Sequence, residues 1–167
     1  PSAIAQLPKV KERVAAVANF RKASKAASTR DYPYPTLFRQ VTQPNSDYVL
    51  VPRHSSERRE YVPFGFFTKT SIVADSCLAI PNATLGEFSV VQSLMHMIWM
   101  KTVCGRLESR YRYSKDIVYN NFPWPDLDEK AKAALTETAQ AILDARANHP
   151  GATLADLYDP DAMPPDL

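Results

Sequence analysis

A long apolar segment, residues 84–104, constrains the fold of this chain more than any other feature of its sequence. Thr84 and Glu87 have the spacing of a capping box at its start, and Gly105 is a natural stop after it, so we expect one continuous helix. Its centre, FSVVQSLMHMIWM, is apolar nearly all round. A helix that is apolar on every side is stable only when it is buried. The segment therefore predicts a central helix in the core of the protein.

Short strand patterns precede this helix. Strand-favouring β-branched and aromatic residues recur in residues 48–52, 61–67, 72–75 and 77–81. Between the first two segments lies the polar sequence RHSSERRE, which is typical of a hairpin loop. Together these segments predict a small, mostly antiparallel sheet over residues 47–81.

A helix is also predicted at each end of the chain. Residues 7 to about 28 have apolar side chains at helical spacing, with Pro8 at the first helical position. Asp126 and Glu129 mark the start of an amphipathic helix over about residues 127–148. The expected fold class is α+β, with the small antiparallel sheet packed on the central apolar helix and a further helix at each end.

We expect three parts along the chain. Residues 1–30 form an N-terminal connecting helix, and residues 31–125 form the main domain with the sheet and the central helix. Residues 126–167 form a C-terminal helical segment, whose proline-rich tail indicates an incomplete folding unit.

Charge is distributed unevenly between the two ends of the sequence. Residues 1–116 carry 17 Lys and Arg against 9 Asp and Glu, a net charge of +8, whereas residues 117–167 carry 3 against 9, a net charge of −6. A basic body of this kind indicates a polyanionic partner for the first portion. Solvated surface charge produces the same asymmetry without any partner, so this signal is modest by itself.

Several features place the chain in an aqueous, reducing compartment. No apolar run is long enough to cross a membrane, and the N-terminal residues lack the basic-then-apolar order of a signal peptide. Cys77 and Cys104 are far apart, each within an apolar run, so we expect both to be reduced, buried and structural. These features suit the cytoplasm.

The stretch Asn121-Phe122-Pro123-Trp124 is similar to the catalytic loop of amino-methyltransferases, which reads Asp or Asn, two prolines and an aromatic residue. Such enzymes hold S-adenosylmethionine with a glycine-rich turn. This chain has four glycines and no Gly-x-Gly, and its motif has one proline where the catalytic loop has two. Asn121 is therefore predicted to be a structural hydrogen-bonding residue.

Other catalytic patterns fail in the same way. His54, His96 and His149 are isolated from one another and from the cysteines, without metal-ligand spacing. His96 lies in the apolar helix, where we expect a core histidine whose hydrogen bonds are satisfied. We predict no catalytic residue, no metal site and no cofactor for this chain, and it is not expected to be an enzyme by itself.

Two polar loops, residues 53–59 and 106–114, carry the groups that a DNA-binding surface needs. Arg on guanine and Glu or Asp on cytosine discriminate bases, whereas Arg, Lys and hydroxyl groups hold phosphates. In an extended segment Glu108, Arg110 and Arg112 point the same way, because side chains alternate along a strand. The alternative is a solvated loop whose charges pair with one another. The candidates for phosphate contacts are Ser55, Ser56, Arg58, Arg59, Arg106, Tyr113, Ser114 and Lys115.

A set of short motifs carries a family resemblance over nearly the whole chain. The motifs are VPRHSSERREYVP (51–63), IPNATL (80–85), MHM (95–97), CGRL (104–107), YRYS (111–114) and IVYNNFPWP (117–125). This combination resembles the target recognition domain of MmeI-like (type IIL) restriction–modification enzymes and related large adenine methyltransferases. The resemblance continues into the start of their C-terminal helical part.

The resemblance implies a function that the chain performs as one part of a larger parent. In that family a nuclease, an adenine-N6 methyltransferase and a recognition domain share one polypeptide, and this chain matches the recognition domain. The implied partners are double-stranded DNA and the methyltransferase domain of the same parent, in the bacterial cytoplasm. The implied cofactors belong to the parent: S-adenosylmethionine, and Mg²⁺ for a nuclease domain.

The resemblance also implies which residues read bases. It pairs Arg53 with Asp75 and Glu108 with Arg110, and each pair suits one G·C base pair. A third set contains Ser76 and Arg112. The stretch 117–125 resembles the exit from the recognition domain, where Tyr119, Phe122 and Trp124 are expected to pack.

Two alternatives stay open on the sequence. One is an interdomain scaffold, in which the basic surface docks onto the methyltransferase domain without contacting bases. The other is a remnant catalytic domain that uses Asn121.

Overall fold

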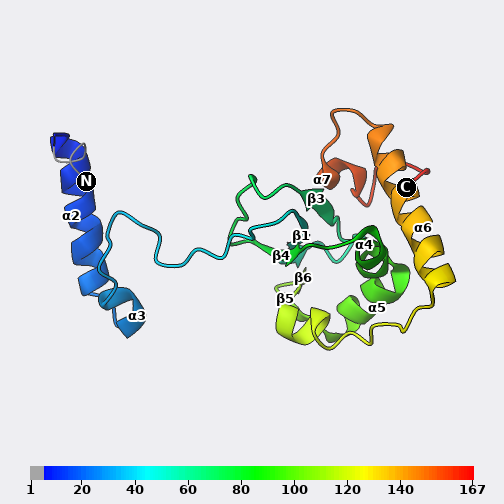
Figure 1. Ribbon diagram of the computed structural model, residues 1–167, viewed down its shortest axis with the longest axis horizontal. Coiled ribbons are helices and arrows are strands. Elements are labelled where there is room, and N and C mark those ends of the chain that lie inside the picture. The colour runs from blue at the N-terminus through cyan, green and yellow to red at the C-terminus, as the bar shows by residue number, and fades with distance from the viewer. Residues whose placement is uncertain (1–5) are drawn as a thin grey trace. The chain divides into compact units, whose positions relative to one another are not determined.

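The computed structural model describes residues 6–167, and the chain forms two compact units that divide between Thr42 and Gln43 (Figure 1). The second unit, from Gln43 to Leu167, contains both β-sheets and the helices that pack on them. It also carries every residue predicted to read bases or to hold phosphates. In residues 6–167 no helix is both long and apolar enough to cross a membrane.

The first unit contains the helices α2 (Pro8–Lys22) and α3 (Ala27–Arg30). Pro8 lies in the first turn of α2, as predicted. The prediction of one helix to about residue 28 was wrong, because the chain turns between the two helices. There the Ser24 hydroxyl accepts a hydrogen bond from the backbone N–H of Ala26 at 3.3 Å, which competes with the helical pattern.

One sheet of the second unit has the strand order β3-β1-β4, with all pairs antiparallel. Its strands are β1 (Tyr48–Pro52), β3 (Gly65–Phe67) and β4 (Cys77–Pro81). The predicted strand over 61–67 is shorter than expected, since pairing begins only at Gly65. The predicted strand over 72–75 was wrong, because those residues form the irregular approach to β4.

A second antiparallel sheet, which the sequence pattern did not indicate, has the order β2-β6-β5. Its strands are β2 (His54–Ser55), β5 (Gly105–Leu107) and β6 (Arg110–Arg112). Residues 105–112 fold back on themselves as a hairpin, and Glu108 in the turn has a positive φ of 57°. The single extended segment expected here is therefore replaced by two short paired strands.

The central apolar segment forms two helices, α4 (Leu85–Gln92) and α5 (Leu94–Val103), so the prediction of one continuous helix was wrong. Ser93 between them is extended, and its hydroxyl donates to the Val90 carbonyl at 2.6 Å and accepts from the His96 N–H at 3.2 Å. Ser93 thus ends α4 and caps α5.

The two ends of this segment differ in how well the sequence predicted them. The capping box of Thr84 and Glu87 is confirmed at the start of α4. The expected stop before Gly105 holds to within one residue, since α5 ends at Val103 with Cys104 as its C-cap and Gly105 begins β5.

The two central helices differ in burial: α4 is buried all round over residues 88–92, whereas α5 is buried on one side only. Phe88, Met97 and Met100 have no exposed surface, and they pack with Val49 of β1 in the core. On the opposite side of α5 the side chains of Leu94, Met95 and Ile98 are about half exposed, at 49%, 58% and 57%. The prediction of burial all round was therefore wrong for α5.

The C-terminal segment packs on the same core through α6 (Glu129–Ala147), which lies beside α4 (Figure 1). Its N-cap is Asp128, which accepts from the Ala131 N–H at 2.7 Å, rather than the expected Asp126. After α6 the chain turns into the short helix α7 (Leu154–Leu157). The predicted α+β class, with a helix at each end, is confirmed.

Arg146 joins this C-terminal segment to the rest of the second unit. Its guanidinium donates to the Phe64 carbonyl at 2.8 Å and to the Tyr158 hydroxyl at 2.6 Å. The same guanidinium lies 5.4 Å from the centre of the Phe88 ring. One side chain therefore connects α6 to the approach to β3, to α4 and to the chain after α7.

Candidate nucleic-acid interface

Arg53 lies where the chain passes from one sheet to the other. Its backbone N–H donates to the Ser76 carbonyl at 2.9 Å, and its carbonyl accepts from the Tyr113 N–H at 2.7 Å. Its guanidinium Nε donates to the Cys77 carbonyl at 3.4 Å. The fold thus brings Arg53 beside the Asp75–Ser76 segment that precedes β4, and next to the end of β6.

Arg110 and Arg112 lie on one face of β6. Both are exposed, whereas Tyr111 between them is 9% exposed, so the expected alternation holds for these two arginines. Glu108 does not continue this alternation, because it lies in the turn before β6 rather than in a strand. The turn nevertheless leaves Glu108 close to Arg110.

Glu108 and Arg110 form an ion pair with each other. Arg110 Nη2 lies 2.7 Å from Glu108 Oε2, and the side chains are 47% and 76% exposed. An exposed pair of this kind stabilises a fold by about 1 kcal/mol or less. Replacing the ion pair with hydrogen bonds to other groups therefore costs little free energy. The two side chains are therefore oriented together and are available to another set of hydrogen-bonding groups.

His54 is a residue of this face that the sequence did not single out for binding. It is half-buried and lies directly opposite Arg112 in the β2–β6 pairing. Its position directly after Arg53 was the one sequence feature that indicated a place in the site. The pairing of the short strands β2 and β6, which are far apart in the sequence, could not be foreseen.

Burial separates two of the predicted phosphate contacts from the surface. Ser55 is 5% exposed and Tyr113 is 4% exposed. The Tyr113 hydroxyl is hydrogen-bonded to His96 Nε2 at 2.9 Å instead, and burial raises its pKa. A phosphate group outside the fold cannot reach either side chain in this arrangement, so we assign neither to DNA contact.

His96 is a core histidine with only part of its hydrogen-bonding capacity used. It has no exposed surface, and burial lowers its pKa to about 4. Within residues 6–167, neither His96 Nδ1 nor the buried Ser55 hydroxyl has a hydrogen-bond partner. The expectation that His96 is fully satisfied was therefore wrong for one of its two ring nitrogens.

Arg58 and Arg59 hold the C-terminal segment. Arg59 donates to the Tyr158 carbonyl at 2.9 Å and to the Ala155 carbonyl at 3.0 Å, and Arg58 forms an ion pair with Asp161. The Arg59 guanidinium thus makes hydrogen bonds within the fold. The sequence had assigned these hydrogen bonds to DNA phosphates.

The remaining predicted phosphate contacts have local partners. The Ser56 hydroxyl accepts from the Arg58 N–H at 3.2 Å, and the exposed Lys115 is paired with Asp116. Ser114 caps the π-helical turn η1 (Lys115–Tyr119) by accepting from the Ile117 N–H at 3.2 Å.

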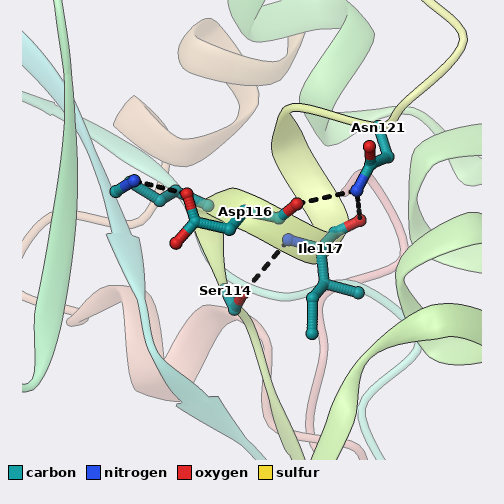
Figure 2. Close-up of polar contacts among 5 residues, drawn as sticks. Ser114, Asp116, Ile117 and Asn121 are labelled. Carbon is teal, nitrogen blue, oxygen red and sulfur yellow. Dashed lines mark hydrogen bonds and ion pairs between the residues drawn. The ribbon is translucent and has the colours of Figure 1, made fainter.

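The structural role predicted for Asn121 is confirmed (Figure 2). Its side-chain Nδ2 donates to the backbone carbonyls of Asp116 at 2.7 Å and Ile117 at 3.2 Å, which closes the end of η1. The amide that a catalytic loop would direct at a substrate amine is therefore engaged by the protein's own backbone. This removes the reason to treat the chain as a remnant catalytic domain.

The expected packing of the exit stretch is confirmed as well. The ring of Trp124 lies 5.2 Å from that of Tyr119 and 5.5 Å from that of Phe122. Phe122 also contacts the His96 ring at 4.5 Å, edge to face. This cluster joins the end of β6 and η1 to helix α5.

The cysteines and the acidic groups form no metal-binding cluster in the described part of the chain. Cys77 and Cys104 are free thiols, half-buried rather than buried as expected, and burial raises the pKa of Cys104. Over residues 6–167 there is no group of three or more His, Cys, Asp or Glu side chains placed to hold a metal ion.

Two family models match the chain end to end. The model of the MmeI target recognition domain matches residues 1–126, and the model of the MmeI C-terminal domain matches residues 127–167. The chain therefore belongs to the MmeI target recognition domain family, continued by part of the MmeI C-terminal domain. The resemblance carried by the sequence motifs is confirmed.

Two relatives of this chain extend the comparison. A solved structure of the Type IIL restriction-modification enzyme MmeI in complex with DNA is 45% identical, with a TM-score of 0.91 and 99% of this chain covered. DNA methyltransferase A of Bacillus subtilis (strain 168) is 36% identical over 161 residues, which is 96% of this chain. The chain spans 22% and 18% of the lengths of these two proteins.

Proposed function

We propose that this chain is the double-stranded DNA recognition module of a larger site-specific DNA methyltransferase. The observation that carries the proposal is the face formed where the two sheets meet. There Arg53 and the Asp75–Ser76 segment lie beside a strand that exposes Arg110 and Arg112. The 45% identity to an enzyme solved in complex with DNA supports the same function.

The base-reading groups act in three sets. Arg53 and Asp75 suit one G·C pair, because a guanidinium donates to guanine N7 and O6 while a carboxylate accepts from the cytosine amino group. Glu108 and Arg110 supply the same two kinds of group for a second G·C pair. Ser76 and Arg112 form the third set, whose preferred base the residue types leave open.

Phosphate contacts supply affinity rather than specificity. Among the predicted contacts, Arg58 and Lys115 are exposed, and the hydroxyls of Ser56 and Ser114 retain hydrogen-bonding capacity beyond their caps, so these four keep an accessible position. Each phosphate that a lysine or arginine neutralises makes binding more sensitive to salt.

The parent enzyme supplies the chemistry in this proposal. It is an S-adenosylmethionine-dependent adenine-N6 methyltransferase of the bacterial cytoplasm, with Mg²⁺ for a nuclease domain where it cleaves as well. The recognition module holds the duplex so that the methyltransferase domain can flip the target adenine into its own active site.

Selection of bound duplexes from a random DNA pool at low salt, followed by sequencing, tests the proposal. An enriched motif with fixed G·C pairs is the expected result. Binding without enrichment would leave only a basic surface with phosphate affinity. An absence of binding at low salt would contradict the DNA-recognition proposal.

A scaffold function is the second candidate, and one observation favours it. The exposed side chains of Leu94, Met95 and Ile98 form an apolar strip on α5 that nothing in the second unit covers. Docking of the methyltransferase domain on this strip predicts tight association of that domain with the wild-type chain. It also predicts loss of that association, measured by calorimetry, on Met95→Asp and Ile98→Asp, and no DNA affinity of the wild-type chain.

A further inference from the structure

Strand pairing assigns the side chains of the β2-β6-β5 sheet to two faces. Arg106 lies directly opposite Tyr111, and Tyr111 lies directly opposite Ser55. Residues directly opposite one another in an antiparallel sheet point to the same face, and neighbours along a strand point to opposite faces. Arg106 therefore lies on the face of the hairpin away from Arg110 and Arg112.

The Arg106 guanidinium is occupied within the hairpin. Its Cζ atom lies 4.1 Å from the centre of the Tyr111 ring, and its Nη1 donates to the Ser109 carbonyl at 2.9 Å. Stacking on the largely buried Tyr111 ring and a charge-assisted hydrogen bond both favour this one orientation. The side chain thus bridges from β5 across β6 to the turn.

The turn that Arg106 reaches needs such support. Glu108 has a φ of 57°, in the left-handed region that side chains other than glycine seldom adopt. That conformation costs on the order of 1 kcal/mol or more, and it persists only where surrounding contacts favour it. The Arg106 bond to Ser109, the residue after Glu108, is one such contact.

Glu57, in the loop after β2, also contacts this turn. Hydrogen bonds from its own backbone and from the Ser109 side chain lower the pKa of Glu57, and the positive charges of Arg106 and Arg58 act in the same direction. Ser109 and Arg106 thus both act electrostatically on the carboxylate of Glu57. Loop and hairpin tip are thus linked through the two residues that shape the turn.

We infer that Arg106 is a positioning residue for base recognition, which holds the turn so that Glu108 is presented beside Arg110. This role rests on the proposed function of the hairpin in reading a base pair. It differs from the phosphate contact that the residue type alone indicates. The two roles predict different consequences for the same substitutions.

Arg106→Lys separates the two roles because it keeps the positive charge. Lysine lacks the planar guanidinium that stacks on Tyr111 and reaches the Ser109 carbonyl together. If Arg106 positions the turn, the preference of this variant for the correct base over the others falls about tenfold at the one base pair that Glu108 and Arg110 read. The slope of log affinity against log salt stays at the wild-type value, because the number of neutralised phosphates is the same.

The experiment compares the 167-residue chain with Arg106→Lys, Arg106→Gln and the control Arg13→Lys, which makes the same exchange on exposed α2. Each is put through selection from a random duplex pool, then titrated with the selected duplex at several salt concentrations. A relaxed preference at one position in Arg106→Lys, with all other positions and the control unchanged, is expected. An unchanged motif in Arg106→Lys would overturn the inference. So would a salt slope that falls by about 0.9 in Arg106→Gln together with uniformly weaker binding.

Failure of the proposed function is recognised separately. If the wild-type chain enriches no motif, the DNA-recognition proposal fails, and hydrogen exchange in the absence of DNA still tests Arg106. Faster exchange of the amides of residues 107–110 in Arg106→Lys, with η1 and α5 unchanged, is expected. Equal exchange rates in the wild type and the variant would show that Arg106 does not hold the turn.

Discussion

At the scale of single residues, the ion pair of Glu108 and Arg110 is where the fold meets the proposed base discrimination. The two side chains are held 2.7 Å apart at the surface, one in a left-handed turn and one in the following strand. One carboxylate and one guanidinium in register match the amino group of cytosine and the N7 and O6 acceptors of guanine.

Exchanging the charges of this pair tests that relation. The double variant Glu108→Lys and Arg110→Asp is expected to change the preferred base at one position, because the donor and acceptor groups exchange places. The preferred base is expected to be favoured over the others by about 1–3 kcal/mol. Selection of bound duplexes from a random pool measures this preference. The double variant Glu129→Lys and Lys132→Glu makes the matched exchange on the exposed ion pair of α6. A motif that is the same in all three proteins would remove Glu108 and Arg110 from base reading.

His96 makes stability depend on pH. Its pKa is about 4 in the folded protein, lowered by burial from 6.5, so between these values the unfolded chain binds a proton that the folded chain does not. The free energy of unfolding therefore falls as pH drops from 6.5 to about 4, by about 3 kcal/mol in all from this residue. Above pH 6.5 the contribution is constant.

Urea denaturation at a series of pH values measures this effect. The variant His96→Gln keeps a hydrogen-bonding side chain toward Tyr113 but has no titrating group, so its stability is expected to fall less steeply over the same range. His54→Gln, which removes a half-buried imidazole from the second sheet, is the control for loss of an imidazole outside the core. Equal slopes for His96→Gln and the wild type would contradict burial of a neutral His96.

At the scale of elements, the break at Ser93 turns one apolar segment into two helices with different orientations. Its hydroxyl makes two backbone hydrogen bonds, one to each helix. The break lets α4 pack against α6, while α5 contacts η1 and the aromatic cluster around Phe122. A single straight helix would not make both sets of contacts.

Ser93→Ala is expected to destabilise the protein by about 1 kcal/mol, the usual cost of a lost N-cap. Chemical denaturation measures the change. Thr102→Ala is the matched control, since it removes a hydroxyl from exposed α5 that bonds only to a carbonyl of its own helix. The control is expected to stay within about 0.5 kcal/mol of the wild type. If the two variants are equally stable, the serine is not the cap that divides the helices.

At the scale of the whole molecule, the C-terminal segment and the sheets form one folded unit. Arg146 joins α6 to Phe64 and Tyr158, and Arg59 binds the carbonyls of Ala155 and Tyr158. The loop from Ser56 to Glu60 is therefore fixed by chain that lies about a hundred residues further on. Strand β2, directly before this loop, pairs with β6, so the C-terminal segment supports the proposed base-reading hairpin without belonging to it.

A double-mutant cycle tests this connection. Arg146→Met and Tyr158→Phe are each expected to destabilise the second unit by about 1–3 kcal/mol, because each leaves a buried polar partner without its hydrogen bond. The two residues share that hydrogen bond. The double variant is therefore expected to lose less unfolding free energy than the sum of the two single variants, by about 0.5 kcal/mol or more. Additive losses in chemical denaturation would mean that the two residues act independently.

Local chemistry determined much of this protein. The capping box of Thr84 and Glu87, Pro8 at its helix start, the structural Asn121 and the α+β class all follow from residues near one another in the sequence. The same holds for the family motifs, which are short and contiguous. Neighbouring residues are sufficient there because caps and turns are closed by hydrogen bonds over three or four positions.

Only the tertiary structure decided which polar residues face outward together. Ser55 and Tyr113 look like surface hydroxyls in the sequence, but pairing of β2 with β6 and contact with His96 bury them. Arg59 resembles a phosphate contact and instead binds carbonyls near the C-terminus. The three-part division at residues 30 and 125 and the base-reading roles stay predictions. Long-range pairing determines burial, and two-residue and three-residue strands carry too little periodicity for the sequence alone to specify it.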